Sequence, residues 1–291
     1  MAPMDARSRV RQFLARGTAD RPPFLAMATD YTARLAQCTT GELLADPGLF
    51  VRSFTESVAV LGLEAVLVEI PAAQVLAVAA GDDPAAGGLA VLREDLYRLR
   101  ATLRDRVAIV ALLPGPVTLA GSLRGAAALR SASAPEALDD LVAGLIRAQE
   151  FLGPAELDAL ALLERAGVAD EDVPALADAA AAFWNVARYY ALPSLLVAAK
   201  ATARLAAAGP TAVAAWSGAT AAELLAGGVM AAGQPPSAGQ PPSAGQPPSA
   251  GQPPPAVPAP LPPGGFYLSA DEIPADWPVD SVRSLVRPLS W

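Results

Sequence analysis

Four short apolar runs in this chain each stop on a carboxylate. The runs are Leu25–Asp30, Ala65–Glu69, Leu160–Glu164 and Phe266–Asp271. Parallel strands that are buried on both faces have such continuous apolar sequences, and in a parallel barrel their carboxyl ends gather at one rim. The pattern therefore predicts parallel strands whose polar groups meet at one end, although Leu160–Glu164 fits a helix equally well.

Helical segments alternate with these runs. Asp46 and Pro47 are typical of a helix start, and the helix that follows is expected to end at Gly62. Further helices are expected over 89–103, 133–151, 174–189 and 202–207 and from 279, with more strands at 107–113, 194–199, 211–216 and 229–232. Eight strands with helices between them predict an α/β fold, a (β/α)8 TIM-like barrel.

A proline-rich repeat interrupts this alternation. The hexad Gly-Gln-Pro-Pro-Ser-Ala occurs three times from Gly233, and prolines continue to Pro263. Proline removes backbone donors and nothing apolar recurs, so a disordered insertion is predicted between strands seven and eight, where the seventh helix is either missing or displaced. We expect the main part of the barrel over 1–232, the insertion over 233–263, and a closing strand and helix over 264–291. A tolerated surface insertion explains the repeat best, and a tether for a protein partner is the alternative.

The charge of the chain excludes several partners. The formal net charge is −8 and no basic patch is present, which argues against nucleic acid. Arg7, Arg9 and Arg11 are expected on the solvated side of an N-terminal helix, and Arg100 is expected to point outward from its own helix. No signal-peptide core and no long apolar run occurs, so we expect a cytoplasmic protein without a membrane partner.

The chain lacks the residues of several common active sites. Histidine is absent and Cys38 is the single cysteine. These absences exclude catalysis by serine or cysteine with a histidine base. They also exclude zinc bound by histidine and an intrachain disulfide. Four carboxylates leave an oxygen-ligand Mg²⁺ site open as an alternative, but no recognised spacing supports it, so we predict no metal site and no cofactor. Acid–base chemistry must use Asp, Glu, Tyr, Lys or Arg.

Three segments together resemble the uroporphyrinogen decarboxylase superfamily, which also contains corrinoid-dependent methyltransferases. They are Arg21–Met27, similar to an Arg-Pro-Pro opening of the first strand; Pro114–Ala120, similar to the Gly-Pro-Phe-Thr-Leu-Ala turn after the third; and Leu268–Pro274, similar to the closing Gly-Cys-Glu-Ile-Pro segment of the eighth. Their order and spacing span nearly the whole chain. The resemblance implies a barrel enzyme that carries out decarboxylation or methyl transfer.

The motifs that carry chemistry in that superfamily are changed here. The Met-Arg-Gln-Ala-Gly-Arg run, whose arginines bind substrate carboxylates in the decarboxylases, is matched by Met27–Arg34, which loses both arginine positions and has a displaced Arg34. Glu69 matches the aspartate at the end of the second strand. The methyltransferases hold zinc through His-x-Cys and a late cysteine, and Asp271 occupies the late position. Without the arginines, an octacarboxylate substrate would be poorly neutralised.

The predicted site consists of polar residues at strand ends. The predicted catalytic residues are Asp30, Glu69, Glu164 and Asp271. The predicted substrate-binding residues are Tyr31, Arg34, Gly115, Lys200, Trp216 and Glu272. Crowded carboxylates repel one another, which raises at least one pKa toward a range useful for acid–base chemistry. Structural roles stay open for several of them: a helix ion pair for Glu164, caps for Asp271 and Glu272, and a tight turn for Gly115.

Two functions follow as hypotheses. In the first, the chain is a divergent enzyme of this superfamily that acts on a small molecule by proton transfer through carboxylates. In the second, it is a non-catalytic barrel that binds a ligand or partner and uses the proline-rich loop as a tether. A homodimer is a further expectation.

Overall fold

A parallel sheet forms the centre of the molecule in the computed structural model, which describes residues 4–16, 19–21, 23–124, 135–164, 173–201, 212–218, 230–233, 265–268 and 278–286. Its strands are β1 (Phe24–Leu25), β2 (Ala65–Glu69), β3 (Ala108–Pro114), β4 (Ala159–Glu164), β5 (Ser194–Ala201), β6 (Ala212–Gly218), β7 (Met230–Gly233) and β8 (Gly265–Leu268). They form one eight-stranded sheet in the order β1-β8-β7-β6-β5-β4-β3-β2, and every pair is parallel. The strands at the two ends of this order, β1 and β2, also contact each other. The predicted parallel α/β architecture is confirmed.

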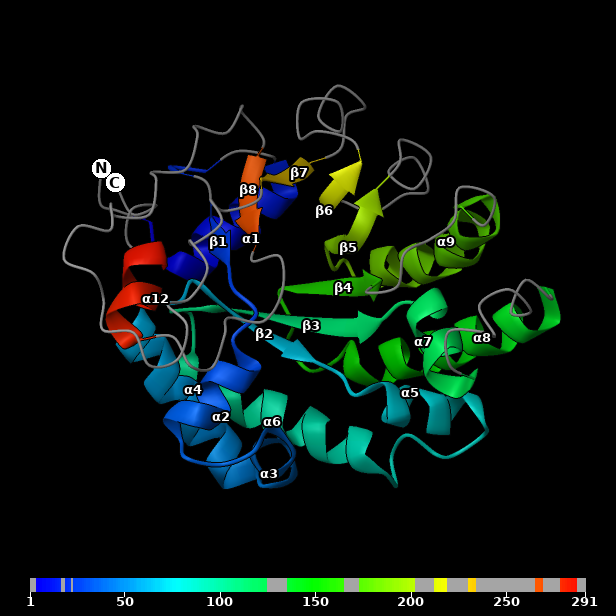
Figure 1. Ribbon diagram of the computed structural model, residues 1–291, viewed down its shortest axis with the longest axis horizontal. Coiled ribbons are helices and arrows are strands. Elements are labelled where there is room, and N and C mark those ends of the chain that lie inside the picture. The colour runs from blue at the N-terminus through cyan, green and yellow to red at the C-terminus, as the bar shows by residue number, and fades with distance from the viewer. Residues whose placement is uncertain are drawn as a thin grey trace, which may run out of the picture.

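The described helices precede β1, lie between successive strands from β1 to β5, and follow β8 along the chain (Figure 1). They are α1 (Ala6–Arg16), α2 (Thr29–Leu35), α3 (Thr40–Ala45), α4 (Pro47–Leu61), α5 (Ala72–Ala79), α6 (Gly88–Leu103), α7 (Pro116–Arg124), α8 (Pro135–Leu152), α9 (Val173–Tyr189) and α12 (Val279–Val286). The expected helix over 202–207, the capping residue Ser133, the place of the seventh helix and the proline-rich repeat lie outside the described residues.

Local signals set the ends of α4 as the sequence predicts. Asp46 is the N-cap, and its carboxylate accepts hydrogen bonds from the backbone N–H groups of Gly48 and Leu49 at 2.8 and 3.0 Å. Pro47 takes the first helical position. Gly62 ends the helix with a φ of 74°, a left-handed conformation that glycine adopts without a steric penalty.

One prediction about the first strand is wrong. The chain leaves β1 after Leu25 and enters α2 at Thr29, so Asp30 lies in the first turn of a helix and not at the end of a strand. The apolar residues between them, Ala26–Ala28, are buried, which accounts for their strand-like sequence. The other seven predicted strands are present within a few residues of their expected bounds.

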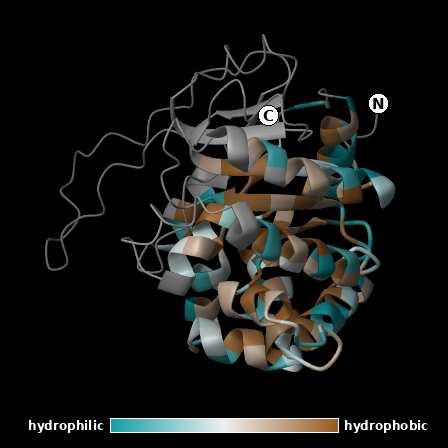
Figure 2. Ribbon diagram, turned by 90° about the vertical axis from the view of Figure 1, so that its right-hand side faces the viewer, coloured by the Kyte–Doolittle hydropathy of each residue, from teal (hydrophilic) through white to brown (hydrophobic). Residues whose placement is uncertain are grey.

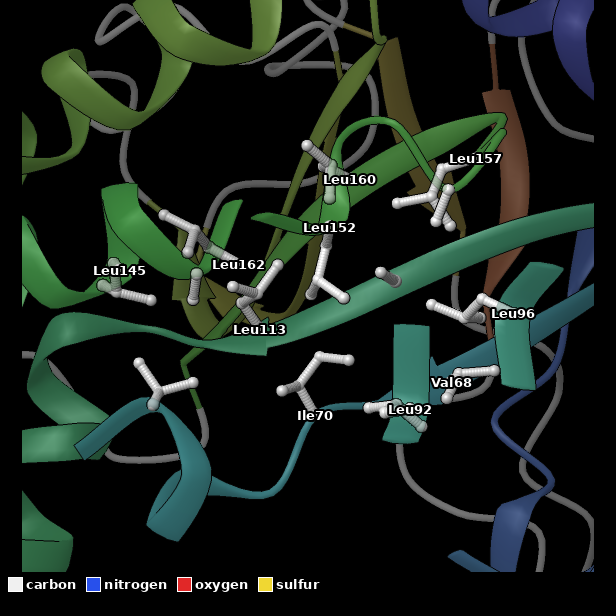
Figure 3. Close-up of a cluster of buried hydrophobic side chains, with 14 of the residues drawn as sticks. Val68, Ile70, Leu92, Leu96, Leu113, Leu145, Leu152, Leu157, Leu160 and Leu162 are labelled. Atoms are coloured by element: carbon white, nitrogen blue, oxygen red, sulfur yellow. The ribbon is translucent and has the colours of Figure 1, made fainter. Parts of the chain in front are cut away.

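The larger part of the core lies on one face of the sheet. Val66 and Val68, which alternate on β2, and Ile70 just after it pack against the helices α4 to α9. Figure 3 shows this packing between the strands and the helices α6 and α8, through Val68, Ile70, Leu113, Leu160 and Leu162 from the strand side and Leu92, Leu96, Leu145 and Leu152 from the helices. We call this side the helix face.

The opposite face packs against α1, and we call it the α1 face. It is formed by the remaining alternate residues of the strands, which include Ala65, Leu67 and Ala161, together with Val10 and Phe13 of α1. Strands that are apolar on both faces appear as the brown ribbons at the centre of Figure 2. Ion pairs of α1 with Glu64 and Asp158, the residues just before β2 and β4, place α1 at the amino ends of the strands.

The predicted solvation of the arginines is wrong for three of the four. Arg9 is buried and pairs with Glu64 at 2.5 Å and with Asp20 at 2.7 Å. Arg7 pairs with Asp158, as does the buried Arg100. Their acidic partners are distant in the sequence, so helical periodicity does not reveal these ion pairs. Judged by periodicity alone, the guanidinium groups are predicted to be exposed to solvent. Arg11 is exposed, as predicted.

Asp95 of α6 is an exception among the buried carboxylates. Its side chain is fully buried, and neither oxygen has a hydrogen-bond partner among the described residues. Burial raises its pKa from the ordinary value of 3.8 to about 6. An acid with a raised pKa binds its proton more tightly in the folded protein, so its contribution to stability falls as the pH rises through 6.

Asp95→Leu is therefore expected to stabilise the protein. The free energy of unfolding at pH 8 should rise by about 1–3 kcal/mol, because the substitution removes a buried, unsatisfied charge, and the gain should shrink at pH 5. Urea denaturation at the two pH values measures the difference, with the exposed neighbour change Glu94→Gln as control. A loss of stability at both values would refute this explanation.

No helix in the described parts of the chain is both long and apolar enough to cross a membrane.

Candidate functional site at the carboxyl ends of the strands

Glu69 is the last residue of β2 and is half-buried. It alternates with Ala65 and Leu67, so it belongs to the α1 face, and it pairs in register with Leu112 of β3, which lies on the same face. Because α1 covers the amino ends of the strands, Glu69 lies at the end of this face that α1 leaves uncovered. A carboxylate in this place can exchange a proton with a molecule that enters from the carboxyl ends.

Glu164 ends β4 but does not join Glu69. Through the β2–β3–β4 register, Glu69 is level with Ala161, three residues before Glu164. Ala161 belongs to the α1 face, whereas Leu160 and Leu162, which alternate with Glu164, belong to the helix face. The two carboxylates therefore lie at different heights and on opposite faces, and the predicted convergence does not include this pair.

The carboxylate of Glu164 lies against the start of α7. It accepts hydrogen bonds from the backbone N–H of Val117 at 3.1 Å and of Thr118 at 2.9 Å. The side chain is fully buried, and burial raises its pKa to about 7, although the hydrogen bonds from Thr118 and Val117 oppose the rise. Desolvation is therefore the dominant effect at this carboxyl group.

Gly115 is needed because Glu164 comes so close to it. A Cβ atom at position 115 would lie 2.2 Å from Cδ of Glu164, and the Gly115 N–H donates to the carbonyl of Leu163 at 2.9 Å. Gly115, predicted to lie in a tight turn, connects β3 to α7 and packs directly against the end of β4. Sequence reasoning missed Thr118 as a partner of this group, although Pro116 is a recognisable signal for a helix start.

Gly115→Ala is expected to cost about 1–3 kcal/mol of stability, because the methyl group and the buried carboxyl cannot occupy the same space. Chemical denaturation measures the loss. Gly121→Ala in α7 is the control, because a Cβ atom there meets nothing within 4 Å. Equal effects of the two changes would contradict the close approach of Glu164.

Asp30, Tyr31 and Arg34 lie together on α2. The exposed Asp30 accepts a hydrogen bond of 2.6 Å from the hydroxyl of Thr40. Tyr31 is buried in a cluster with Phe24, and the exposed guanidinium of Arg34 lies 4.7 Å from the centre of its ring. The displaced arginine of the sequence therefore stacks on a core tyrosine.

The remaining predicted residues are placed only in part. Lys200 belongs to β5 and pairs in register with Ser217 of β6, and Trp216 is the residue before Ser217 on that strand. Asp271 and Glu272 lie outside the described residues.

The zinc site that the methyltransferase resemblance implies does not fit this chain. Histidine is absent, and the thiol of Cys38, the single cysteine, lies 3.5 Å from the carbonyl of Ala33 beside α2. The described residues also contain no group of three or more acidic or cysteine side chains that could hold a metal ion.

A groove of about 510 Å³ lies away from the strand ends, between α4 and α6. Its lining includes Val51, Arg52 and Thr55 of α4 and Arg98 and Thr102 of α6. None of the predicted site residues lines it.

Comparison with solved structures identifies the fold. A methyltransferase from Methanosarcina mazei superposes with a TM-score of 0.72 over 99% of each chain, at 16% sequence identity. The protein shares the fold of this solved structure. No family model and no curated protein matches the sequence. The match covers 99% of this chain, and the low identity leaves the residues of the site to be judged from their own geometry.

Proposed function

We propose that the protein is an enzyme that acts on a small molecule at the carboxyl ends of its strands, with Glu69 as the group that donates or accepts a proton. In this proposal β1 and β2 close the sheet into a (β/α)8 barrel and the α1 face is its interior. The supporting observation is the position of Glu69 at the end of that face opposite α1.

Decarboxylation and methyl transfer are the two reactions to consider. Decarboxylation replaces a carboxylate by a proton and releases carbon dioxide, so it needs a proton donor where Glu69 lies. The fold shared with the M. mazei methyltransferase supports methyl transfer. In decarboxylation, a carboxyl group can donate the proton that replaces the lost carboxylate. In methyl transfer, it can change the protonation state of the methyl acceptor or of the leaving group.

A substrate panel tests the proposal. The purified protein is incubated anaerobically with uroporphyrinogen, with small carboxylic acids, and with methylcobalamin plus a thiol, and products are followed by mass spectrometry. Loss of carbon dioxide or gain of a methyl group supports an enzyme. Uroporphyrinogen is expected to react poorly, since the arginines of the decarboxylase motif are absent and Arg34 stacks on Tyr31.

Binding without catalysis is a second candidate, and one observation favours it. Two of the predicted catalytic carboxylates serve local structure, since Asp30 accepts from Thr40 and Glu164 caps α7. Under this candidate, a compound from the panel raises the melting temperature without forming product. Product formation at a rate proportional to protein concentration would exclude it.

A further inference from the structure

The hydroxyl of Thr118 lies between two acceptors. Its Oγ1 is 2.8 Å from Oε2 of Glu164 and 3.2 Å from the backbone carbonyl oxygen of Leu163. A hydroxyl has one proton and can donate only one strong hydrogen bond. If Thr118 donates to Leu163, its short contact with Glu164 requires a proton on the carboxyl group.

We infer that Glu164 holds a proton in the folded protein near and below neutral pH, and that the chain from Glu164 through Thr118 to the Leu163 carbonyl locks the first turn of α7 onto the end of β4. The carboxyl group then donates to Thr118, and Thr118 donates to Leu163. The backbone N–H groups of Val117 and Thr118 remain bonded to the carboxyl oxygens.

The surroundings of Glu164 favour the neutral form. The side chain is fully buried, β3 (Ala108–Pro114) has no charged residue, and α7 has none before Arg124. The charged residues described on α8 and α9, which pack against α7, are exposed: Asp139, Asp140, Arg147, Glu150, Asp178 and Arg188. On the neighbouring β5, Lys200 follows two residues after Ala198, the register partner of Glu164. Full burial makes the charge of a carboxylate costly, and protonation removes that cost.

Linkage gives the direction of the pH effect. The raised pKa of Glu164, about 7, means that the locked state binds the proton more tightly than an opened state in which water reaches the carboxylate. Raising the pH from the ordinary pKa of 4.5 through 7 therefore favours opening of the first turn of α7, and the effect levels off once the carboxyl group is ionised in both states. Because this turn continues from Gly115, opening would move backbone at the carboxyl ends of the strands, and any effect on turnover rests on the proposed function.

The test is amide hydrogen exchange of α7 measured from pH 6 to 8.5 and corrected for the intrinsic exchange rate. In the wild-type protein, protection of the first-turn amides is expected to fall by about tenfold or more across this range. Glu164→Gln cannot ionise, so its protection should be independent of pH, although lower throughout because one backbone N–H loses an acceptor. Thr118→Val, which removes the bridging hydroxyl, should lower protection at pH 6 most strongly.

A carboxyl ¹³C NMR titration of Glu164 provides the independent measurement. A titration midpoint near 7 agrees with the inference, and a midpoint near the ordinary value of 4.5 overturns it. The same pH dependence in wild type and Glu164→Gln would also overturn it. Neither measurement needs a substrate, so the inference can fail while the proposed function stands, and the reverse.

Discussion

Replacing Asp158 with alanine is expected to lower the free energy of unfolding by about 3–5 kcal/mol. Asp158 is buried just before β4 and receives hydrogen bonds from Arg100, from Nε of Arg7 at 2.8 Å and from the backbone N–H of Ile109 at 2.9 Å. Its loss leaves the buried guanidinium of Arg100 without its counter-ion. The cost arises mainly from that unpaired charge, and chemical denaturation at pH 7 measures it.

Asp105→Ala is the matched control for this change. Asp105 pairs with the same Arg7, but its side chain is 87% exposed, so its removal should cost less than about 1 kcal/mol. The double change Asp158→Ala with Arg100→Leu should recover part of the loss, because it removes both buried charges. Equal effects of Asp158→Ala and Asp105→Ala would refute the importance of burial.

Glu69→Gln is expected to lower kcat/KM by about 10²–10⁴-fold for any substrate found in the panel, because the amide keeps the shape of the side chain and cannot transfer a proton. The free energy of unfolding should change by less than about 0.5 kcal/mol, since Glu69 is only half-buried at a strand end. Steady-state kinetics and denaturation on the same preparation separate the two effects.

Glu150→Gln provides the control for Glu69. Glu150 is exposed on α8, and its change should leave the kinetics unaltered. If Glu69→Gln keeps full activity, proton transfer by Glu69 is refuted. If it unfolds the protein instead, Glu69 has a structural role.

Helices and strands that are determined by residues close to them in the sequence could be predicted. The limits of α4 follow from Asp46, Pro47 and Gly62, and strands such as β3 follow from continuous apolar residues that are buried on both faces. The start of α2 could not be predicted in this way, because the buried residues between Leu25 and Thr29 have the same apolar sequence as a strand. Burial determines the residue type in both cases.

The pairing of charges could not be predicted, because it depends on tertiary contacts. Arg100 and Asp158 are 58 residues apart and Arg9 and Glu64 are 55 apart, so no helical pattern relates them. The face of the sheet on which Glu69 or Glu164 lies could not be predicted for the same reason. Each ends an apolar run, but the register with the neighbouring strands decides which face a side chain joins.

The place where a small molecule binds distinguishes a site at Glu69 from a site elsewhere on the protein. Backbone amide exchange is measured with and without a panel compound that raises the melting temperature. We expect slower exchange at the carboxyl ends of β2 and β3, around Glu69 and Gly115, and a weaker effect in Glu69→Gln. Slower exchange confined to the groove between α4 and α6, or to the amino ends of the strands beside α1, would contradict a site at Glu69.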